Sequence, residues 1–154
     1  NVGKSTFINS FAGRACAKTG NKPGVTKGKQ WIRLNKNLEL LDTPGILWPR
    51  FENQKVGEHL AMIGSINDDI IQMDELAYAT ISYITKAYPG LLEARFGIEM
   101  KENSFEALKA ICKTRGCFLK GEEPDVMRAS QLVMEDFRNG KIGQITLESP
   151  EEWQ

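Results

Sequence analysis

The chain opens, at residues 1–6, with the stretch Asn1-Val2-Gly3-Lys4-Ser5-Thr6. Its Gly-Lys-Ser run is the second half of the phosphate-binding loop pattern G-x-x-x-x-G-K-[ST]. The first glycine of that pattern would precede this stretch, so we expect the chain to follow an upstream segment that also holds the launching strand. Phe7, Ile8 and Phe11 then recur on one side of a short helix, which Gly13 is well placed to end.

The same stretch predicts an anion site at the start of that helix. Gly3 lets the backbone approach a phosphate, and the first-turn amides and the helix dipole favour negative charge there. Lys4 would reach the terminal phosphates, and the Ser5 hydroxyl would ligate magnesium. By itself the motif is a weak signal, because a chance glycine before a lysine at a helix start has the same letters. The nucleotide-binding residues predicted in this stretch are Asn1, Val2, Gly3, Lys4, Ser5 and Thr6.

A second motif follows at the distance that a GTPase needs. Residues 30–34 and 38–41 are predicted strands of a hairpin with a short polar turn, and the second strand leads into Asp42-Thr43-Pro44-Gly45. In this D-x-x-G pattern Asp42 would hold magnesium through water, and the Gly45 amide would contact the γ-phosphate. The two motifs together predict the α/β class and part of a P-loop NTPase domain, in the element order of small GTPases.

Between the motifs, residues 21–28 form a polar, glycine-containing loop that is suited to a nucleotide-dependent switch. Thr26 is the residue of this loop that would close over magnesium and the γ-phosphate. We predict catalytic roles for Lys4, Thr26 and Gly45, and magnesium ligation by Ser5, Thr26 and Asp42.

Two groups that an ordinary GTPase carries are not found in the sequence. Residues 21–24 begin like the guanine-recognising N-K-x-D, but Gly24 supplies no carboxylate. Ile46 follows Gly45, where Ras-like enzymes have the glutamine that orients the attacking water. The water-orienting group therefore has to come from elsewhere. His59, the only histidine, is a candidate by residue type alone, and we favour a structural role for it.

From residue 67 onward the pattern is helical. One helix begins at a capping Asp74, a second at Asn103 with capping-box spacing, and a third at Asp125. Their apolar positions predict the core of a small all-α domain. We therefore divide the chain into a partial P-loop domain at residues 1–66 and a helical domain at residues 67–154.

Charge is distributed unevenly along this chain of 154 residues. Residues 1–66 carry 10 basic and 4 acidic side chains, which suits a phosphate ligand or RNA but also fits an ordinary solvated face. On the helices, basic residues are interleaved with acidic ones, so a solvated mixed surface and an RNA-contacting patch both remain open. The basic residues concerned are Lys109, Lys113, Arg115, Lys120, Arg128, Arg138 and Lys141.

Cysteine usage and hydropathy indicate the compartment. Cys16, Cys112 and Cys117 lack the paired spacing of a zinc site, so we expect reduced thiols in a cytoplasmic protein. No apolar run reaches the roughly 18 residues that span a bilayer. We expect a monomer with no membrane or DNA partner.

Three segments together resemble the circularly permuted ribosome biogenesis GTPases of the YlqF/RbgA type. They are residues 1–6, residues 23–28 (Pro-Gly-Val-Thr-Lys-Gly) and residues 42–49 (Asp-Thr-Pro-Gly-Ile-Leu-Trp-Pro). Residues 136–143 and 145–148 also resemble the helical C-terminal domain of that family. The resemblance covers nearly the whole chain.

The resemblance implies a GTPase that uses GTP and Mg²⁺ and assists late assembly of the large ribosomal subunit, by binding precursor particles of rRNA and ribosomal proteins. It also implies that the guanine-binding motifs lie upstream of the phosphate loop and that a hydrophobic residue, here Ile46, replaces the catalytic glutamine. Asn1 matches the asparagine that helps hold a potassium ion near the phosphates in related GTPases.

Two alternatives stay open beside the GTPase. The chain could be a helical RNA-binding or ribosome-docking module attached to an inactive partial NTPase, which nucleotide-binding assays would reveal. An ATPase is the weaker alternative, and competition between bases would decide it.

Overall fold

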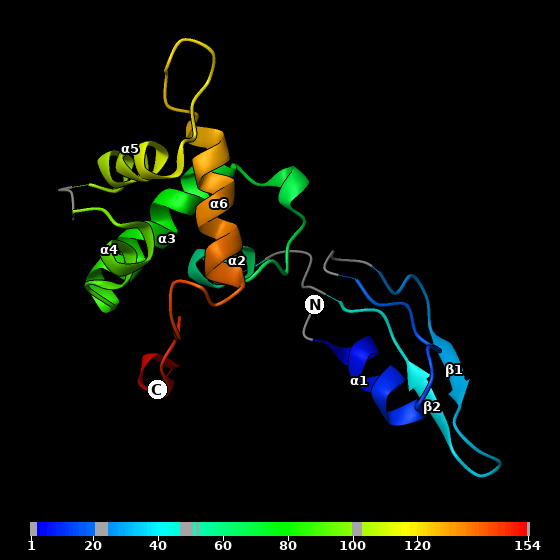
Figure 1. The fold of residues 1–154 in the computed structure, drawn as a ribbon. Helices are drawn as coiled ribbons and strands as arrows, with labels where there is room; N and C mark the ends of the chain where they lie inside the picture. The colour runs from blue at the N-terminus through cyan, green and yellow to red at the C-terminus, as the bar shows by residue number, and fades with distance from the viewer. Residues whose placement is uncertain (1–2, 21–24, 47–50, 52, 100–102, 154) are drawn as a thin grey trace.

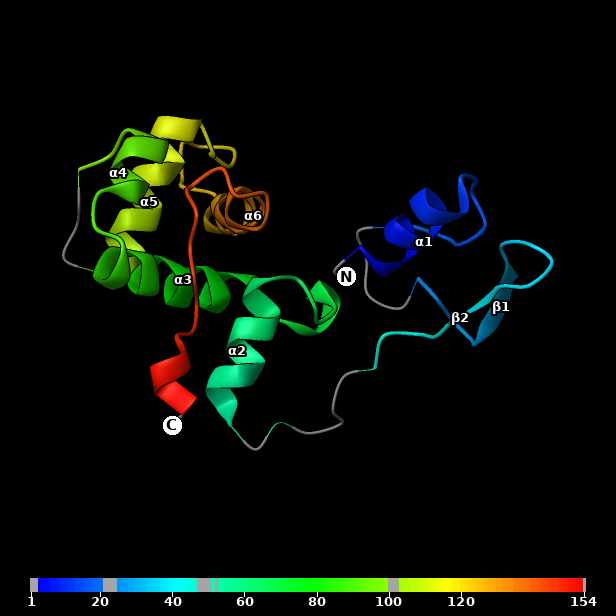
Figure 2. The ribbon, with the colours of Figure 1, turned by 90° about the horizontal axis from the view of Figure 1, so that it is seen from below.

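The computed structural model describes residues 3–20, 25–46, 51, 53–99 and 103–153, and it contains two groups of elements (Figure 1). We call residues 3–46 the N-terminal lobe and residues 51–153 the helical lobe. Both views show the two lobes set apart from one another (Figures 1 and 2). The N-terminal lobe contains α1 (Lys4–Ala12), β1 (Gln30–Arg33) and β2 (Glu39–Asp42). The helical lobe contains α2 (Gln54–Met62), η1 (Asp68–Ile70), α3 (Met73–Ala87), α4 (Leu91–Phe96), α5 (Ser104–Arg115), α6 (Val126–Arg138) and η2 (Pro150–Trp153).

Helix α1 confirms the short helix predicted after the Gly-Lys-Ser run. Gly13 ends it in the left-handed conformation, with φ of 64°. Ile8 is the buried residue of this helix. Phe7 and Phe11 are 67% and 61% exposed, and their rings stack with centroids 6.0 Å apart. The predicted apolar side is therefore buried at Ile8 and open to solvent at both phenylalanines.

The hairpin of β1 and β2 confirms the two strands expected around a polar turn. In its antiparallel register, Trp31 faces Leu41 and Gln30 faces Asp42. Because side chains alternate between the two faces of a strand, Ile32 is buried while Trp31 is exposed. The small core of this lobe consists of Ile8, Ala17 and Ile32, with Cys16, Leu34 and Leu40 packed against it.

One side chain of α1 organises the chain that follows this helix. The Asn9 carboxamide oxygen accepts from the main-chain N–H groups of Cys16 and Ala17, at 2.9 and 2.7 Å. Its Nδ2 donates to the Ala17 carbonyl at 2.8 Å. Three hydrogen bonds from one amide thus fix the path of the segment that leads toward the predicted switch loop.

Local sequence signals set the ends of the helices in the helical lobe. Asn103 caps α5 by accepting from the Glu106 N–H at 2.9 Å, and Asp125 caps α6 by accepting from the Arg128 N–H at 2.9 Å. Both predicted caps are confirmed. The predicted cap at Asp74 is wrong, because α3 begins earlier and Asp74 lies inside its first turn. The dipole at the helix start still favours an acidic residue there.

Two helices were not anticipated from the sequence. Helix α2 has Asn53 as its N-cap, accepting from the Lys55 N–H at 2.9 Å. The Phe51 ring packs on this helix at Gly57, where an added Cβ would lie 3.2 Å from the ring. Helix α4 is a short segment bounded by left-handed glycines. Helix α2 packs on α3, although the predicted division between residues 66 and 67 would separate these two helices. That division stays a prediction.

The helical lobe has an extensive core. Its larger cluster joins α3, α4, α5 and α6 around Ile81, Ile84, Leu92, Phe96, Ile98, Ala107, Leu108, Ile111, Cys112, Cys117, Ala129, Val133 and Ile142. A smaller cluster joins α2 to α3 and α6 through Ala61, Met62, Leu76, Ala77 and Met134. The three cysteine thiols are free, and burial raises the pKa of the Cys112 thiol above its ordinary value. Among the described helices, none has both the length and the apolar character needed to cross a membrane.

The C-terminal segment, residues 142–153, passes α3 and ends beside α2 (Figures 1 and 2). His59 Nδ1 lies 3.0 Å from Glu148 Oε1, although 89 residues separate the two in sequence. Lys55 forms an ion pair with Glu152 across 97 residues. The last part of the chain is therefore held against the first helix of its lobe.

Candidate nucleotide site

The start of α1 is built to face an anion. Gly3 precedes the helix with φ of 83°, a left-handed conformation that favours glycine, and an added Cβ would meet no atom within 4 Å. No side chain caps this helix start, and its first turn holds no acidic residue. The N–H groups of the first turn and the positive end of the helix dipole thus remain available for a phosphate. These features fit the predicted phosphate-binding loop.

The two sequence motifs meet at one ion pair. Lys4, in the first turn of α1, pairs through Nζ with Asp42 Oδ1 at the end of β2. Asp42 is 1% exposed, and Gln30 Nε2 donates to its second oxygen at 3.2 Å. A buried carboxylate is stable as an anion only beside positive charge and hydrogen-bond donors, and Lys4 and Gln30 supply both here.

The other predicted site residues occupy different positions. Ser5 is half-buried in the first turn of α1, and Thr6 beside it is exposed. Thr26 and Gly45 lie in segments without regular secondary structure, and in the part of the chain that the structure describes no hydrogen bond joins either of them to Lys4 or Asp42. Asn1 and Val2 lie outside the described residues. The roles assigned to all these residues stay predictions.

Neither Ile46, at the position of the Ras-like glutamine, nor His59 is placed to orient water. Ile46 is 88% exposed and carries no polar atom. His59 is buried in α2 of the helical lobe, beside Glu148, with the Tyr83 ring edge-on at 6.3 Å between centroids. The structural interpretation of His59 is confirmed.

Arg138, one of the basic residues of the suspected RNA patch, holds the helical lobe together instead. Its guanidinium forms two hydrogen bonds with the Asp68 carboxylate, at 2.7 and 2.8 Å. It also donates to the carbonyls of Ala61 and Met62 at the end of α2, at 2.9 and 3.0 Å. This arginine joins α6, α2 and η1, and it holds the pKa of Asp68 below the ordinary value of 3.8.

Other basic residues of that patch also have partners inside the helical lobe. Lys141 Nζ lies 3.2 Å from Asp136 Oδ1, and Lys109 Nζ lies at the same distance from Glu106 Oε1. Arg115 donates to a main-chain carbonyl at 2.7 Å. Over the described ranges, the members of the patch without an ion-pair partner are Lys113, Arg115, Lys120 and Arg128. The contacts favour a mixed, solvated surface on these helices.

Three important residues were missed by reasoning from sequence. Gln30 contacts Asp42 because the two residues face one another in the hairpin. The contact could have been predicted only if the register of the two strands were known. Asn9 contacts main-chain groups, and Arg138 contacts both main-chain carbonyls and the Asp68 carboxylate 70 residues away, so the sequence near either residue does not indicate these roles. No group of three or more His, Cys, Asp or Glu side chains suited to a metal occurs in the described residues.

Comparison with known proteins extends these observations. A family model described as "50S ribosome-binding GTPase" matches residues 1–87. A protein of Bacillus cereus named Ribosome biogenesis GTPase A is 47% identical over 154 residues, which is 99% of this chain and 52% of that protein. The Thermotoga maritima protein of the same name is 31% identical over 152 residues, 99% of this chain and 54% of the relative.

Solved structures agree with these sequence relatives. A GDP-bound structure of YlqF matches with a TM-score of 0.64 at 28% identity, covering 98% of this chain and 57% of that one. A crystal structure of GNP-bound YlqF from T. maritima matches with a TM-score of 0.60 at 30% identity, covering 98% and 56%. The chain spans about half the length of the relatives that it matches.

Proposed function

This chain belongs to the 50S ribosome-binding GTPase family, and from that premise we propose that it carries the phosphate-binding half of a GTP-hydrolysing ribosome assembly factor. The resemblance to the YlqF/RbgA type is confirmed by relatives of that name. The P-loop GTPase fold follows from the same comparisons. The proposal extends to the large-subunit precursor as the partner and to a circularly permuted order with guanine recognition upstream.

The ion pair between Lys4 and Asp42 carries the proposal. It brings the phosphate-loop lysine and the D-x-x-G aspartate together across 38 residues, at the open start of α1. Lys4 would contact the β- and γ-phosphates of bound GTP, and Ser5, Thr26 and Asp42 would hold Mg²⁺. When bound, that ion would supply positive charge beside the phosphates.

The buried Asp42 carboxylate needs a positive partner in either state. Lys4 supplies that charge in this structure, and a cation held by Asp42 would supply it if Lys4 turned to the phosphates. Gly45 reports the γ-phosphate through its amide, and Thr26 closes over it. Asn1, which lies outside the described residues, is proposed as a potassium ligand from the resemblance alone.

The helical lobe follows the D-x-x-G segment directly, and we propose that it is an all-α domain that docks on the ribosomal particle. Its self-contained core, which includes α2, supports this proposal. The residue directly after Gly45 is the aliphatic Ile46, which cannot orient the hydrolytic water. Hydrolysis therefore depends on a group from another part of the protein or from the bound particle.

The test is GTP turnover by the full-length protein in Mg²⁺ and K⁺, with and without purified large ribosomal subunits. We expect slow turnover alone and a strong rise with subunits. Subunit binding without any change in turnover would instead support the docking module with an inactive nucleotide site. Equal competition by ATP and GTP for the site would contradict the assignment to GTP.

A further inference from the structure

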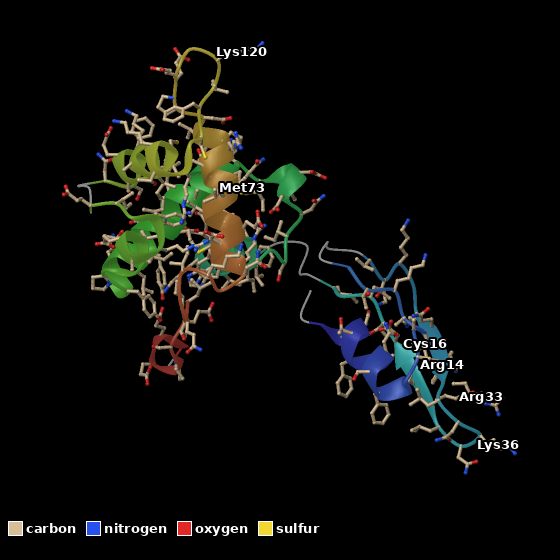
Figure 3. All side chains as sticks on the ribbon, in the orientation of Figure 1. Arg14, Cys16, Arg33, Lys36, Met73 and Lys120 are labelled. Carbon is tan, nitrogen blue, oxygen red and sulfur yellow. The ribbon has the colours of Figure 1, made fainter. Side chains whose placement is uncertain are left out.

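A surface groove of about 330 Å³ lies in the N-terminal lobe and adjoins the nucleotide site at Gln30, which also donates to Asp42. It is lined by the segment after α1 and by strand β1, through Arg14, Ala15, Cys16, Gln30, Trp31, Ile32 and Arg33. Arg14 bridges its two sides by donating to the Arg33 carbonyl at 2.7 Å. Figure 3 shows Arg33 and Lys36 following one another along the hairpin, with Arg14 of the segment after α1 next to Arg33.

The charge around this groove is strongly positive. The described residues of the N-terminal lobe contain seven lysines and arginines and two acidic residues, and one of those acids, Asp42, is buried against Lys4. The other acid, Glu39, faces Arg33 in the hairpin register, and within the described residues it forms no ion pair with that arginine. The exposed cations without an ion-pair partner over that range are Arg14, Lys18, Lys27, Lys29, Arg33 and Lys36. Such a surface attracts a polyanion.

An aromatic ring stands among these cations. Trp31 is 68% exposed, and Leu41 opposite it on the same face of the hairpin is 44% exposed. Single-stranded nucleic acids are bound by this combination, since bases stack on exposed aromatic rings while cations contact the phosphates. A basic peptide, by contrast, is repelled by the same charge.

We propose that this groove and the exposed face of the β1–β2 hairpin bind unpaired RNA, with Trp31 stacking on a base and Arg14, Arg33 and Lys36 contacting phosphates. The inference rests on the proposed function, because it names the surface that meets ribosomal RNA. It assigns this contact to the N-terminal lobe, where six of the seven described cations have no ion-pair partner, whereas five of the ten described cations of the helical lobe have one. The four side chains named in this contact are not among the predicted nucleotide-site residues, although Gln30, which lines the groove, also donates to Asp42.

The test uses the full-length protein and a fluorescein-labelled, 20-nucleotide single-stranded RNA of mixed sequence. The variant R14Q/R33Q/K36Q removes three phosphate contacts, so the slope of log affinity against log salt should fall by about 2. Trp31→Leu should weaken binding by roughly tenfold and leave that slope unchanged, because stacking is not ionic. The matched control is K113Q/K120Q/R128Q, which removes three unpaired cations from the helical lobe and should change affinity by less than threefold.

Three results would overturn the proposal. One is a loss in the hairpin variant no larger than in the helical-lobe control. Another is equal binding of poly-glutamate, which offers negative charge without bases to stack. A third is a Trp31 that acrylamide cannot quench in full-length protein in which every other tryptophan, Trp48 and Trp153 included, is replaced by phenylalanine, since other parts of the protein would then cover the ring.

GTP turnover of the hairpin variant without subunits is measured in parallel and should equal that of the unmodified protein. Failure of the proposed function would appear as absent turnover in the unmodified protein. Failure of this inference would appear only in RNA binding, so the two results are distinguishable.

Discussion

The two lobes use their polar and apolar side chains in opposite ways. In the N-terminal lobe the buried apolar side chains are Ile8, Ala17 and Ile32, while Phe7 and Phe11 stand in solvent. The helical lobe buries an extensive core. Some of its charged side chains hold its own elements together, as the Arg138 contacts show. Within the described residues, six of the seven cations of the N-terminal lobe have no ion-pair partner, so this lobe keeps more of its charge available to ligands.

The largest effect is expected at Lys4, which we propose contacts the phosphates directly. We expect Lys4→Ala in the full-length protein to weaken triphosphate binding about a hundredfold, because charge-assisted hydrogen bonds to phosphates are lost. Fluorescent nucleotide titration measures the effect. Lys29→Ala, which removes an exposed lysine of the same lobe, should leave nucleotide affinity nearly unchanged. An unchanged affinity in Lys4→Ala would end the phosphate-loop assignment.

A pair of truncations compares the two lobes directly. Leu108 is fully buried, so Leu108→Ala should lower the free energy of unfolding of the 154-residue chain by about 2–5 kcal/mol. Phe11→Ala removes more atoms but should cost less than about 0.5 kcal/mol, because the ring is exposed. Urea denaturation followed by circular dichroism measures both changes. Equal losses would show that the lobes do not differ in packing.

The pair of Asp68 and Arg138 makes a pH-dependent contribution to the helical lobe. The Arg138 guanidinium keeps the pKa of Asp68 below 3.8 in the folded chain. The stabilisation is therefore present above pH 3.8, and it is lost as the pH falls below that value toward the folded-state pKa. Asp68 is partly exposed, so we expect Asp68→Asn to cost less than about 1 kcal/mol at pH 7. The difference from the unmodified chain should shrink in denaturation at pH 3, and a difference that grew would reverse the sign argued here.

The smallest effect is expected at Ile46. Ile46→Gln should change the intrinsic GTP turnover of the full-length protein by less than about threefold, because an exposed side chain gains no fixed position from the change. A large rise in turnover without ribosomal subunits would show that the loop already places this position as Ras-like enzymes do.

Local signals in the sequence predicted what local interactions decide. Asn103 and Asp125 cap their helices because a side-chain oxygen and an N–H three residues later meet in any helix start. The hairpin followed from strand propensity and a polar turn. The cap predicted at Asp74 failed because α3 begins without a side-chain cap, and packing of its apolar face sets its start instead.

Long-range contacts decide the features that sequence reasoning did not reach. Helix α2 is held by Arg138, 76 residues later, and nothing near α2 announces that partner. At the candidate site, the motif spacing was enough to bring Lys4 to Asp42. It was not enough to find Gln30, whose place depends on the register of two strands.

The attachment of the C-terminal segment to α2 has a consequence for how the chain is made. His59 is synthesised 89 residues before its partner Glu148. At the usual rate of about 5–20 residues per second, α2 waits roughly 4 to 18 seconds before that contact can form. During this interval its apolar face has no α6 to pack on, and the Ala61 and Met62 carbonyls lack the Arg138 guanidinium. The helical lobe therefore closes late in translation, and α2 is the part of it that a chaperone would meet while the chain is still being made.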